Sequence, residues 1–260
     1  MEFRQEFTAF LGASEVDFSE PSPGLYLFPG RDICIRLVPV GSGPAGGFQP
    51  GGCIRTIHLY EDRWRREGER VRLRILAHLG RCRTLFARNC KVKKLDTPEA
   101  GAFLDLYHSY GSARSRYRYG LLSGEGLVAV ATFSAGRPMQ RDRIVQSYEW
   151  VRYASLPDLR VAGGMGKLLQ VFIDDVSPEE VMSYADLEWS DGAVYRTLGF
   201  VEAGRRAPVE FLVDTACWQR ISIEKLDRDR AFRELEAAPD SRFCRITNLG
   251  SIKYLKRITP

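Results

Sequence analysis

Residues 159–200 read LRVAGGMGKLLQVFIDDVSPEEVMSYADLEWSDGAVYRTLGF and contain the most regular succession of elements in the chain. A glycine-rich turn at 163–166 precedes an apolar pattern over 167–174 that recurs at helical spacing. Residues 181–185 are typical of a strand that ends at Asp186, and Asp191 begins a helix that stops at Gly199. The order of glycine turn, helix, strand and helix predicts an α/β domain with strands and helices in packed layers.

The same pattern extends upstream to about residue 90. The sequence predicts a strand over 91–95, a helix opened by Thr97 and Pro98, a hairpin over 118–133 and a strand over 147–154. Before residue 90 it predicts strands over 32–40 and 54–60, a Gly/Pro-rich loop over 41–52 and a basic amphipathic helix over 62–80. We therefore expect an N-terminal α/β region at 1–90, a main domain at 91–213 and a C-terminal extension at 214–260 that contains a helix over 224–237.

The composition is that of a globular protein and excludes several classes. Of 260 residues, 44% are hydrophobic and 27% are charged, which argues against disorder and fibrous repeats. No apolar run is long enough to cross a bilayer and the N-terminus lacks the sections of a signal peptide, so we expect an intracellular, cytoplasmic protein. The six cysteines form no C-x-x-C pair and there are three histidines, which predicts reduced thiols and no metal site.

Positive charge is concentrated in residues 61–94. This segment has nine arginines and three lysines against four acidic residues, a local charge of +8 in a chain whose net charge is +5. Such a surface suits a phosphate backbone, so DNA is the expected partner, although a solvated helix face is the plainer alternative. The candidate contacts are Arg63, Arg65, Arg66, Arg70, Arg72 and Arg74.

The glycine turn is a candidate phosphate site. A helix that starts after flexible glycines presents unpaired N–H groups and the positive end of its dipole to an anion. The alternative is a tight turn that lets the helix pack closely on a sheet.

Residues 91–213 resemble the GCN5-related N-acetyltransferase (GNAT) superfamily, on the order of elements, the glycine loop, Tyr195 and the closing Gly199-Phe200. The resemblance implies a mixed twisted sheet flanked by helices. It also implies an acyl-CoA donor whose pyrophosphate is held by the loop, with Tyr195 protonating the departing thiolate. The implied donor-binding residues are Arg160, Gly163, Gly164, Gly166 and Lys167.

Finer strings resemble a divergent branch of that fold, found in Mom-type phage DNA modification proteins and in phage homing-endonuclease-like proteins. They include His108-Ser-Tyr-Gly111, Tyr148-Glu-Trp-Val-Arg152, Ser183-Tyr-Ala-Asp186 and Trp189-Ser-Asp-Gly192. The resemblance implies modification of the adenine amino group in DNA, with Asp186 as base, Tyr195 as proton donor and Arg152 as positioning residue. Glu149 or His108 would assist the base. His58-Leu-Tyr-Glu61-Asp62-Arg-Trp64 also resembles the end of a very-short-patch-repair-like nuclease domain, and it favours a degenerate DNA-binding remnant.

Each candidate also has a structural interpretation. Arg152 and Asp186 could form a structural ion pair between adjacent strands. Tyr195 could simply pack its ring beneath a helix, and His108 could cap the C-terminus of a helix. Two other functions stay open beside the DNA modifier: an acyl-CoA-dependent N-acetyltransferase of a small amine, and a catalytically silent DNA-binding accessory protein of a mobile element. The donor is also open among acyl-CoA, an aminoacyl-tRNA and another phosphate-bearing metabolite.

Overall fold

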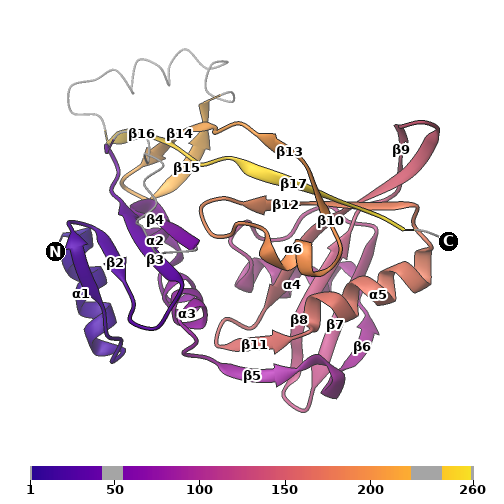
Figure 1. Ribbon diagram of the computed structural model, residues 1–260, viewed down its shortest axis with the longest axis horizontal. Helices are drawn as coiled ribbons and strands as arrows, with labels where there is room; N and C mark the ends of the chain where they lie inside the picture. Colours follow the sequence, from indigo (N-terminus) through magenta and orange to yellow (C-terminus); the bar gives the residue numbers. More distant parts are fainter. Residues whose placement is uncertain (1, 43–54, 224–241, 259–260) are drawn as a thin grey trace. The chain divides into compact units, whose positions relative to one another are not determined.

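The computed structural model describes residues 2–42, 55–223 and 242–258 (Figure 1). The chain forms two compact units, each assembled from separate stretches of sequence. Unit 1 comprises Met1–Val71, Ala185–Gly192 and Arg205–Ile252, and unit 2 comprises Arg72–Tyr184, Ala193–Gly204 and Lys253–Pro260. The sequence predicts a boundary near residue 90, and the chain first passes from unit 1 into unit 2 after Val71.

Unit 1 begins with a helix and a small mixed sheet. The helix α1 (Phe3–Ala13) buries Phe3, Phe7 and Leu11, whose spacing of four residues places them on one face. Strands β1 (Ser19–Ser22), β2 (Leu25–Leu27), β3 (Ile33–Val38) and β4 (Arg55–Tyr60) follow in that order, and only β3 and β4 run parallel. The two strands predicted in this region are confirmed, while most of the loop predicted at 41–52 lies outside the described residues.

The single basic helix predicted over 62–80 is wrong. Two helices occupy the segment, α2 (Glu61–Glu67) and α3 (Glu69–His78), and Gly68 separates them with φ 51° and ψ −119°. Glycine reaches this positive φ without the steric cost that a side chain would add, so the chain changes direction there. The apolar spacing is shared by both helices, which is why it resembled one continuous helix.

A buried ion cluster joins the three stretches of unit 1. It involves β15 (Gln219–Ser222), which lies beside β14 (Glu210–Asp214) and β16 (Phe243–Thr247) in a three-stranded antiparallel sheet. Arg220 on β15 donates to both oxygens of Asp62, at 2.6 and 3.1 Å, and to Glu188 at 2.6 Å. Asp62 and Glu188 are each only 1% exposed. Burial raises the pKa of Glu188 to about 6, against the opposing charge of Arg220.

Unit 2 contains most of an eight-stranded mixed sheet (Figure 1). Its order is β13-β17-β12-β10-β8-β7-β6, and β9 pairs with β10. The strands are β6 (Lys91–Lys94), β7 (Tyr117–Ser123), β8 (Gly126–Phe133), β9 (Arg137–Gln140), β10 (Ile144–Ser155), β12 (Glu180–Asp186), β13 (Val201–Arg206) and β17 (Ser251–Arg257). Strands β6, β7, β8 and β10 pair in succession and all three pairings are antiparallel, whereas β12 runs parallel to β10. The predicted fold class, an α/β (α+β) arrangement with a mixed sheet flanked by helices, is confirmed.

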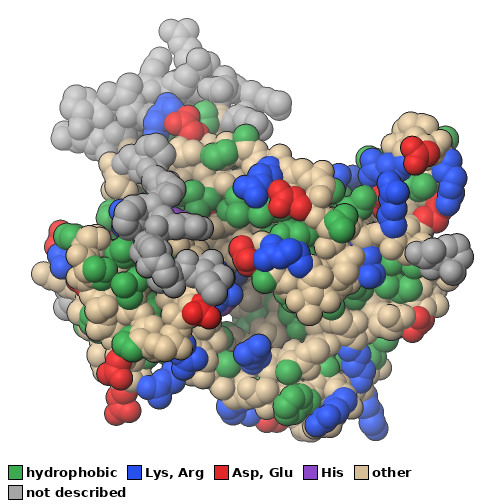
Figure 2. Space-filling model, viewed as in Figure 1, with side chains coloured by type: hydrophobic (Ala, Val, Ile, Leu, Met, Phe, Trp, Pro, Cys, Tyr) green, Lys and Arg blue, Asp and Glu red, His purple; other side chains and the backbone are tan. Residues whose placement is uncertain are grey.

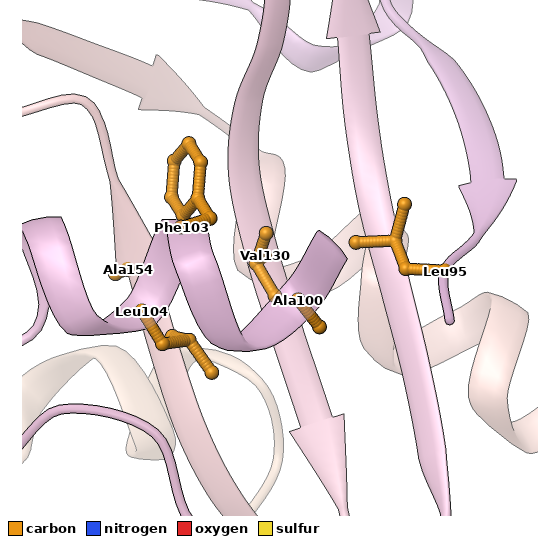
Figure 3. Close-up of a cluster of buried hydrophobic side chains, with 6 residues drawn as sticks. All are labelled: Leu95, Ala100, Phe103, Leu104, Val130 and Ala154. Carbon is orange, nitrogen blue, oxygen red and sulfur yellow. The ribbon is translucent and has the colours of Figure 1, made fainter. Parts of the chain in front are cut away.

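Two helices cover opposite faces of this sheet. On one face, α4 (Thr97–Tyr107) packs Phe103 and Leu104 against Val130 of β8 and Ala154 of β10 (Figure 3). On the other face, Phe172 of α5 (Gly164–Val176) stacks on Phe133 of β8, with ring centroids 3.9 Å apart. Val130 and Phe133 are three residues apart on one strand, so their side chains point to opposite faces.

The remaining elements of unit 2 are short. A second, two-stranded parallel sheet joins β5 (Arg83–Phe86) to β11 (Leu159–Ala162), and β5 continues into a 3₁₀ helix η1 (Ala87–Asn89). The helix predicted from Asp191 is α6 (Ala193–Thr197), with only five residues. The helix predicted over 224–237 lies outside the described residues.

Two further observations bear on the class of protein. Within residues 2–42, 55–223 and 242–258, no helix combines the length and apolarity that crossing a membrane requires. The described cysteines (Cys34, Cys82, Cys90, Cys217 and Cys244) form no disulfide bond with one another.

Removing Arg220 tests the importance of the buried ion cluster. We expect Arg220→Met to lower the free energy of unfolding by about 3–5 kcal/mol, because Asp62 and Glu188 would stay buried without their shared cation. Arg242→Met is the matched control, since Arg242 also pairs with a carboxylate (Asp214) but its side chain is 61% exposed. That variant should lose about 1 kcal/mol or less. Urea-induced unfolding measures both free energies. An equal loss in the two variants would contradict the importance of the buried ion cluster.

His58 on β4 predicts a pH dependence of stability. Burial, reinforced by the charge of Arg36, lowers the pKa of His58 to about 4, whereas an unfolded histidine titrates near ~6.5. The folded state therefore binds this proton more weakly, and the free energy of unfolding should fall as pH drops from about 6.5 to about 4.

The variant His58→Gln isolates that contribution. Its free energy of unfolding should fall less than that of the unchanged protein between pH 7 and pH 4, by up to ~3 kcal/mol. Denaturant titrations at both pH values measure the difference. The same loss in both proteins would show that His58 does not titrate in this way.

Candidate active site

Strands β10 and β12 pair at one end only. Their parallel register joins Ser147 to Glu180, Tyr148 to Val181 and Glu149 to Met182. It stops there, although β10 continues to Ser155 and β12 to Asp186. The two strands therefore part after Glu149 and Met182, and backbone groups beyond that point are not used in a shared ladder.

A β-bulge in β10 lies at the parting. In the antiparallel register with β8, Trp150 pairs with Phe133 and Arg152 with Thr132, so Val151 is an extra residue without an opposite partner. A bulge changes which face later residues occupy. Trp150 consequently stacks on Phe133 on the α5 side, while Ala154 packs on the α4 side.

Tyr195 of α6 reaches the point where the strands part. Ser183 of β12 is buried and its Oγ donates to the carbonyl of Trp150 at 3.0 Å. The Tyr195 hydroxyl lies 2.9 Å from the same Oγ. Because the serine proton is directed at Trp150, Tyr195 donates to Ser183. Burial raises the pKa of Tyr195, so the phenol keeps its proton at neutral pH.

Arg152, His108 and Glu149 also lie in unit 2. Arg152 donates from Nε to the Gly111 carbonyl at 3.1 Å and from a terminal nitrogen to the Val151 carbonyl at 2.9 Å. His108 is the C-cap of α4, and its Nδ1 accepts from the Tyr110 N–H at 3.1 Å. Burial lowers the pKa of Arg152. Arg152 and His108 thus shape the turn that follows α4, and Glu149 stands at the last registered pair before the strands part.

Asp186 belongs to unit 1, whereas the other four catalytic candidates belong to unit 2. Its Oδ1 accepts from the Glu188 N–H at 3.0 Å, which closes a tight turn at the end of β12. The Glu188 carboxylate is in turn held by Arg220. The buried ion cluster therefore fixes the backbone of the turn that carries Asp186.

Helix α5 starts at Gly164, three residues before the start predicted at Lys167, so Gly164 and Gly166 lie in its first turn. Gly163 is the N-cap, with a left-handed φ of 78°, and no side chain caps the helix. The N–H groups of the first turn have no partner within a helix, so they are available to an anion. Arg160 is exposed on β11. Lys167 of the first turn donates to the carbonyls of Ala87 at 3.0 Å and Cys90 at 2.6 Å.

An open pocket of about 570 Å³ lies beside this helix end. Ala162, Gly163 and Lys167 line one side, and Phe86, Ala87 and Arg88 line the other. The parallel pairing of β5 with β11 brings these segments together, with Phe86 opposite Ala162. Sequence reasoning did not assign Phe86 or Arg88 to this pocket. The pairing joins residues more than seventy positions apart, and no local pattern signals it.

The basic segment is partly neutralised by its neighbours. Arg65 pairs with Glu6 and Glu61, while Arg63 and Arg70 both pair with Glu67. Arg74 donates to Ser109, Arg66 is exposed, and Arg72 is half-buried. On the face that Figure 2 shows, cationic and anionic side chains are scattered and form no continuous basic stripe. Three of the arginines predicted to contact phosphates, Arg63, Arg65 and Arg70, thus form ion pairs within the protein.

Over the described ranges, no group of three or more His, Cys, Asp or Glu side chains is arranged to hold a metal ion.

Comparisons with known proteins give only distant similarity. No family model matches the chain, and no curated protein sequence matches it. Among solved structures, a Bacillus subtilis acetyltransferase in complex with CoA is 14% identical, covering 65% of this chain and 99% of that one, with a TM-score of 0.40. A GNAT family acetyltransferase from Elizabethkingia anophelis with acetyl-CoA bound is 11% identical over 65% and 99%, with a TM-score of 0.39.

A protein of unknown function from Enterococcus faecalis, described as a probable N-acyltransferase, is 16% identical, with a TM-score of 0.37. That match covers 51% of this chain and 37% of the Enterococcus chain. At these identities and TM-scores, no residue role or substrate is carried over from any of these proteins.

Proposed function

We propose that this protein is an acyl-CoA-dependent N-acyltransferase. The observation that carries the proposal is the parting of β10 and β12 after Glu149 and Met182, with the Tyr195 hydroxyl at the point of separation. Parted strands expose backbone N–H groups that can polarise a carbonyl, and the tyrosine adds a proton donor at the same place.

The glycine turn of α5 fits a pyrophosphate. A Cβ at Gly164 would lie 2.7 Å from Tyr153 Oη and 2.9 Å from Val161 Cγ1, so this glycine also serves the close packing of the helix start on the neighbouring strands. The uncapped first turn of α5 provides complementary charge for a diphosphate. When bound, acyl-CoA would supply the activated acyl group.

The residues of the chain have distinct roles in this proposal. Tyr195 holds a proton that can be delivered to the departing sulfur, and the hydrogen bond to Ser183 sets the direction of its hydroxyl. Glu149 belongs to the last registered strand pair, and it would accept the proton of the attacking amine. Asp186 as the base stays a prediction from the resemblance.

For the acceptor, we propose a small primary amine. The Mom-type resemblance favours a nucleic acid acceptor, and the charge of the basic segment supports that acceptor. Ion pairs to Glu6, Glu61 and Glu67 offset part of this charge. DNA modification is therefore the second candidate, and silent DNA binding is the third. Digesting the DNA of cells that express the protein to nucleosides and measuring their masses tests the second candidate. A new modified nucleoside is expected only if the protein modifies DNA.

Acyl transfer tests the proposal directly. The purified protein should bind acetyl-CoA and release free CoA thiol in the presence of a panel of primary amines. Tyr195→Phe should lower kcat by about 10²- to 10⁴-fold, because the leaving sulfur loses its proton donor. Glu149→Gln and Asp186→Asn, compared side by side, identify the base.

Tyr119→Phe is the matched control for Tyr195→Phe. Tyr119 belongs to the same unit and its hydroxyl donates to Asp175 at 2.7 Å, but it lies on β7 and not where the strands part. Its kcat should stay within about threefold of the unchanged protein, because it donates no proton to the reaction. An equal loss in both variants, or none in Tyr195→Phe, would contradict the role of Tyr195.

A further inference from the structure

Phe86 is a large aromatic residue at the surface, beside the pocket at the start of α5. Its side chain is 49% exposed although it ends a strand, and the pocket it lines also contains Gly163 and Lys167. The guanidinium carbon of Arg88 lies 4.9 Å from the centroid of its ring. An exposed aromatic ring with an arginine over it is a surface on which a nucleobase can stack and a phosphate can bind.

This platform is fixed in place by α5. Lys167 Nζ donates to the carbonyls of Ala87 and Cys90, at either end of η1. Parallel pairing of β5 with β11 sets Phe86 opposite Ala162, immediately before the N-cap of α5. The backbone that carries the ring and the arginine is therefore held beside the helix end, so it need not be ordered when a ligand binds.

We propose that Phe86 and Arg88 bind the nucleotide end of the donor, with the purine base on the Phe86 ring and a ribose phosphate on Arg88. The inference rests on the proposed function and names the residues that would favour a nucleotide-bearing thioester over a phosphopantetheine carried on a protein. The pocket volume of about 570 Å³ is within the range of ligand sites in proteins.

The test compares three ligands that share the pantetheine arm. Isothermal titration calorimetry would measure the Kd of CoA, 3′-dephospho-CoA and 4′-phosphopantetheine for the full chain. The unchanged protein should bind them in that order of decreasing affinity. Phe86→Leu should weaken CoA binding by about 5- to 100-fold, the range expected for loss of one base–aromatic stack. Phe86→Trp should keep or improve it.

Arg88→Gln should reduce the preference for CoA over 3′-dephospho-CoA to about unity, since only CoA carries the ribose 3′-phosphate. Neither variant should change the affinity for 4′-phosphopantetheine. Arg137→Gln is the control, because Arg137 is exposed on β9 in the same unit but lies outside the pocket. Phe86 and Arg88 are both exposed, so their variants should fold normally.

The outcomes separate this inference from the proposed function. Unchanged CoA affinity in Phe86→Leu and Arg88→Gln would overturn the nucleotide platform and leave the acyltransferase assignment intact. Equal affinity of the unchanged protein for CoA and 4′-phosphopantetheine would do the same. Absence of binding to all three ligands would overturn the proposed function, and the platform with it.

Discussion

The candidate site depends on the end of the hydrogen-bond ladder between β10 and β12. If the register continued past Glu149 and Met182, the carbonyl of Trp150 would pair with the backbone of β12. Instead the Ser183 side chain satisfies that carbonyl and also receives the Tyr195 hydroxyl. A buried carbonyl without a partner would be costly, so this one serine both permits the strands to part and orients the candidate proton donor.

Unit 1 depends on a second constraint. Arg220 on β15 forms ion pairs with Glu188, 32 residues away in the sequence, and with Asp62, 158 residues away, and so connects three separate stretches of the chain. The charges are buried, which makes the cluster sensitive to the loss of any partner. The turn from Asp186 to Glu188 is part of this cluster, so the backbone that presents Asp186 is held by packing in unit 1.

Local signals predicted much of the fold. Alternation and turn residues identified the hairpin of β7 and β8, and the glycine turn and helical spacing identified α5. The sequence did not reveal the break between α2 and α3, because a lone glycine within an amphipathic pattern does not disclose its φ. It did not reveal the partners of Arg65 and Arg220 either, because Glu6 and Asp62 are distant in sequence. Positions defined by long-range pairing, such as Phe86 and Arg88, were missed for the same reason.

Amide hydrogen exchange with and without acetyl-CoA tests the central claim most directly. If the parted strands and the glycine turn form an acyl-CoA site, saturating acetyl-CoA should slow exchange at the first-turn amides of α5, Gly164 to Gly166, and at Val151 in the bulge of β10. Exchange in β9, which lies outside the site, should not change. Unchanged exchange at the α5 amides under saturating acetyl-CoA would contradict the account.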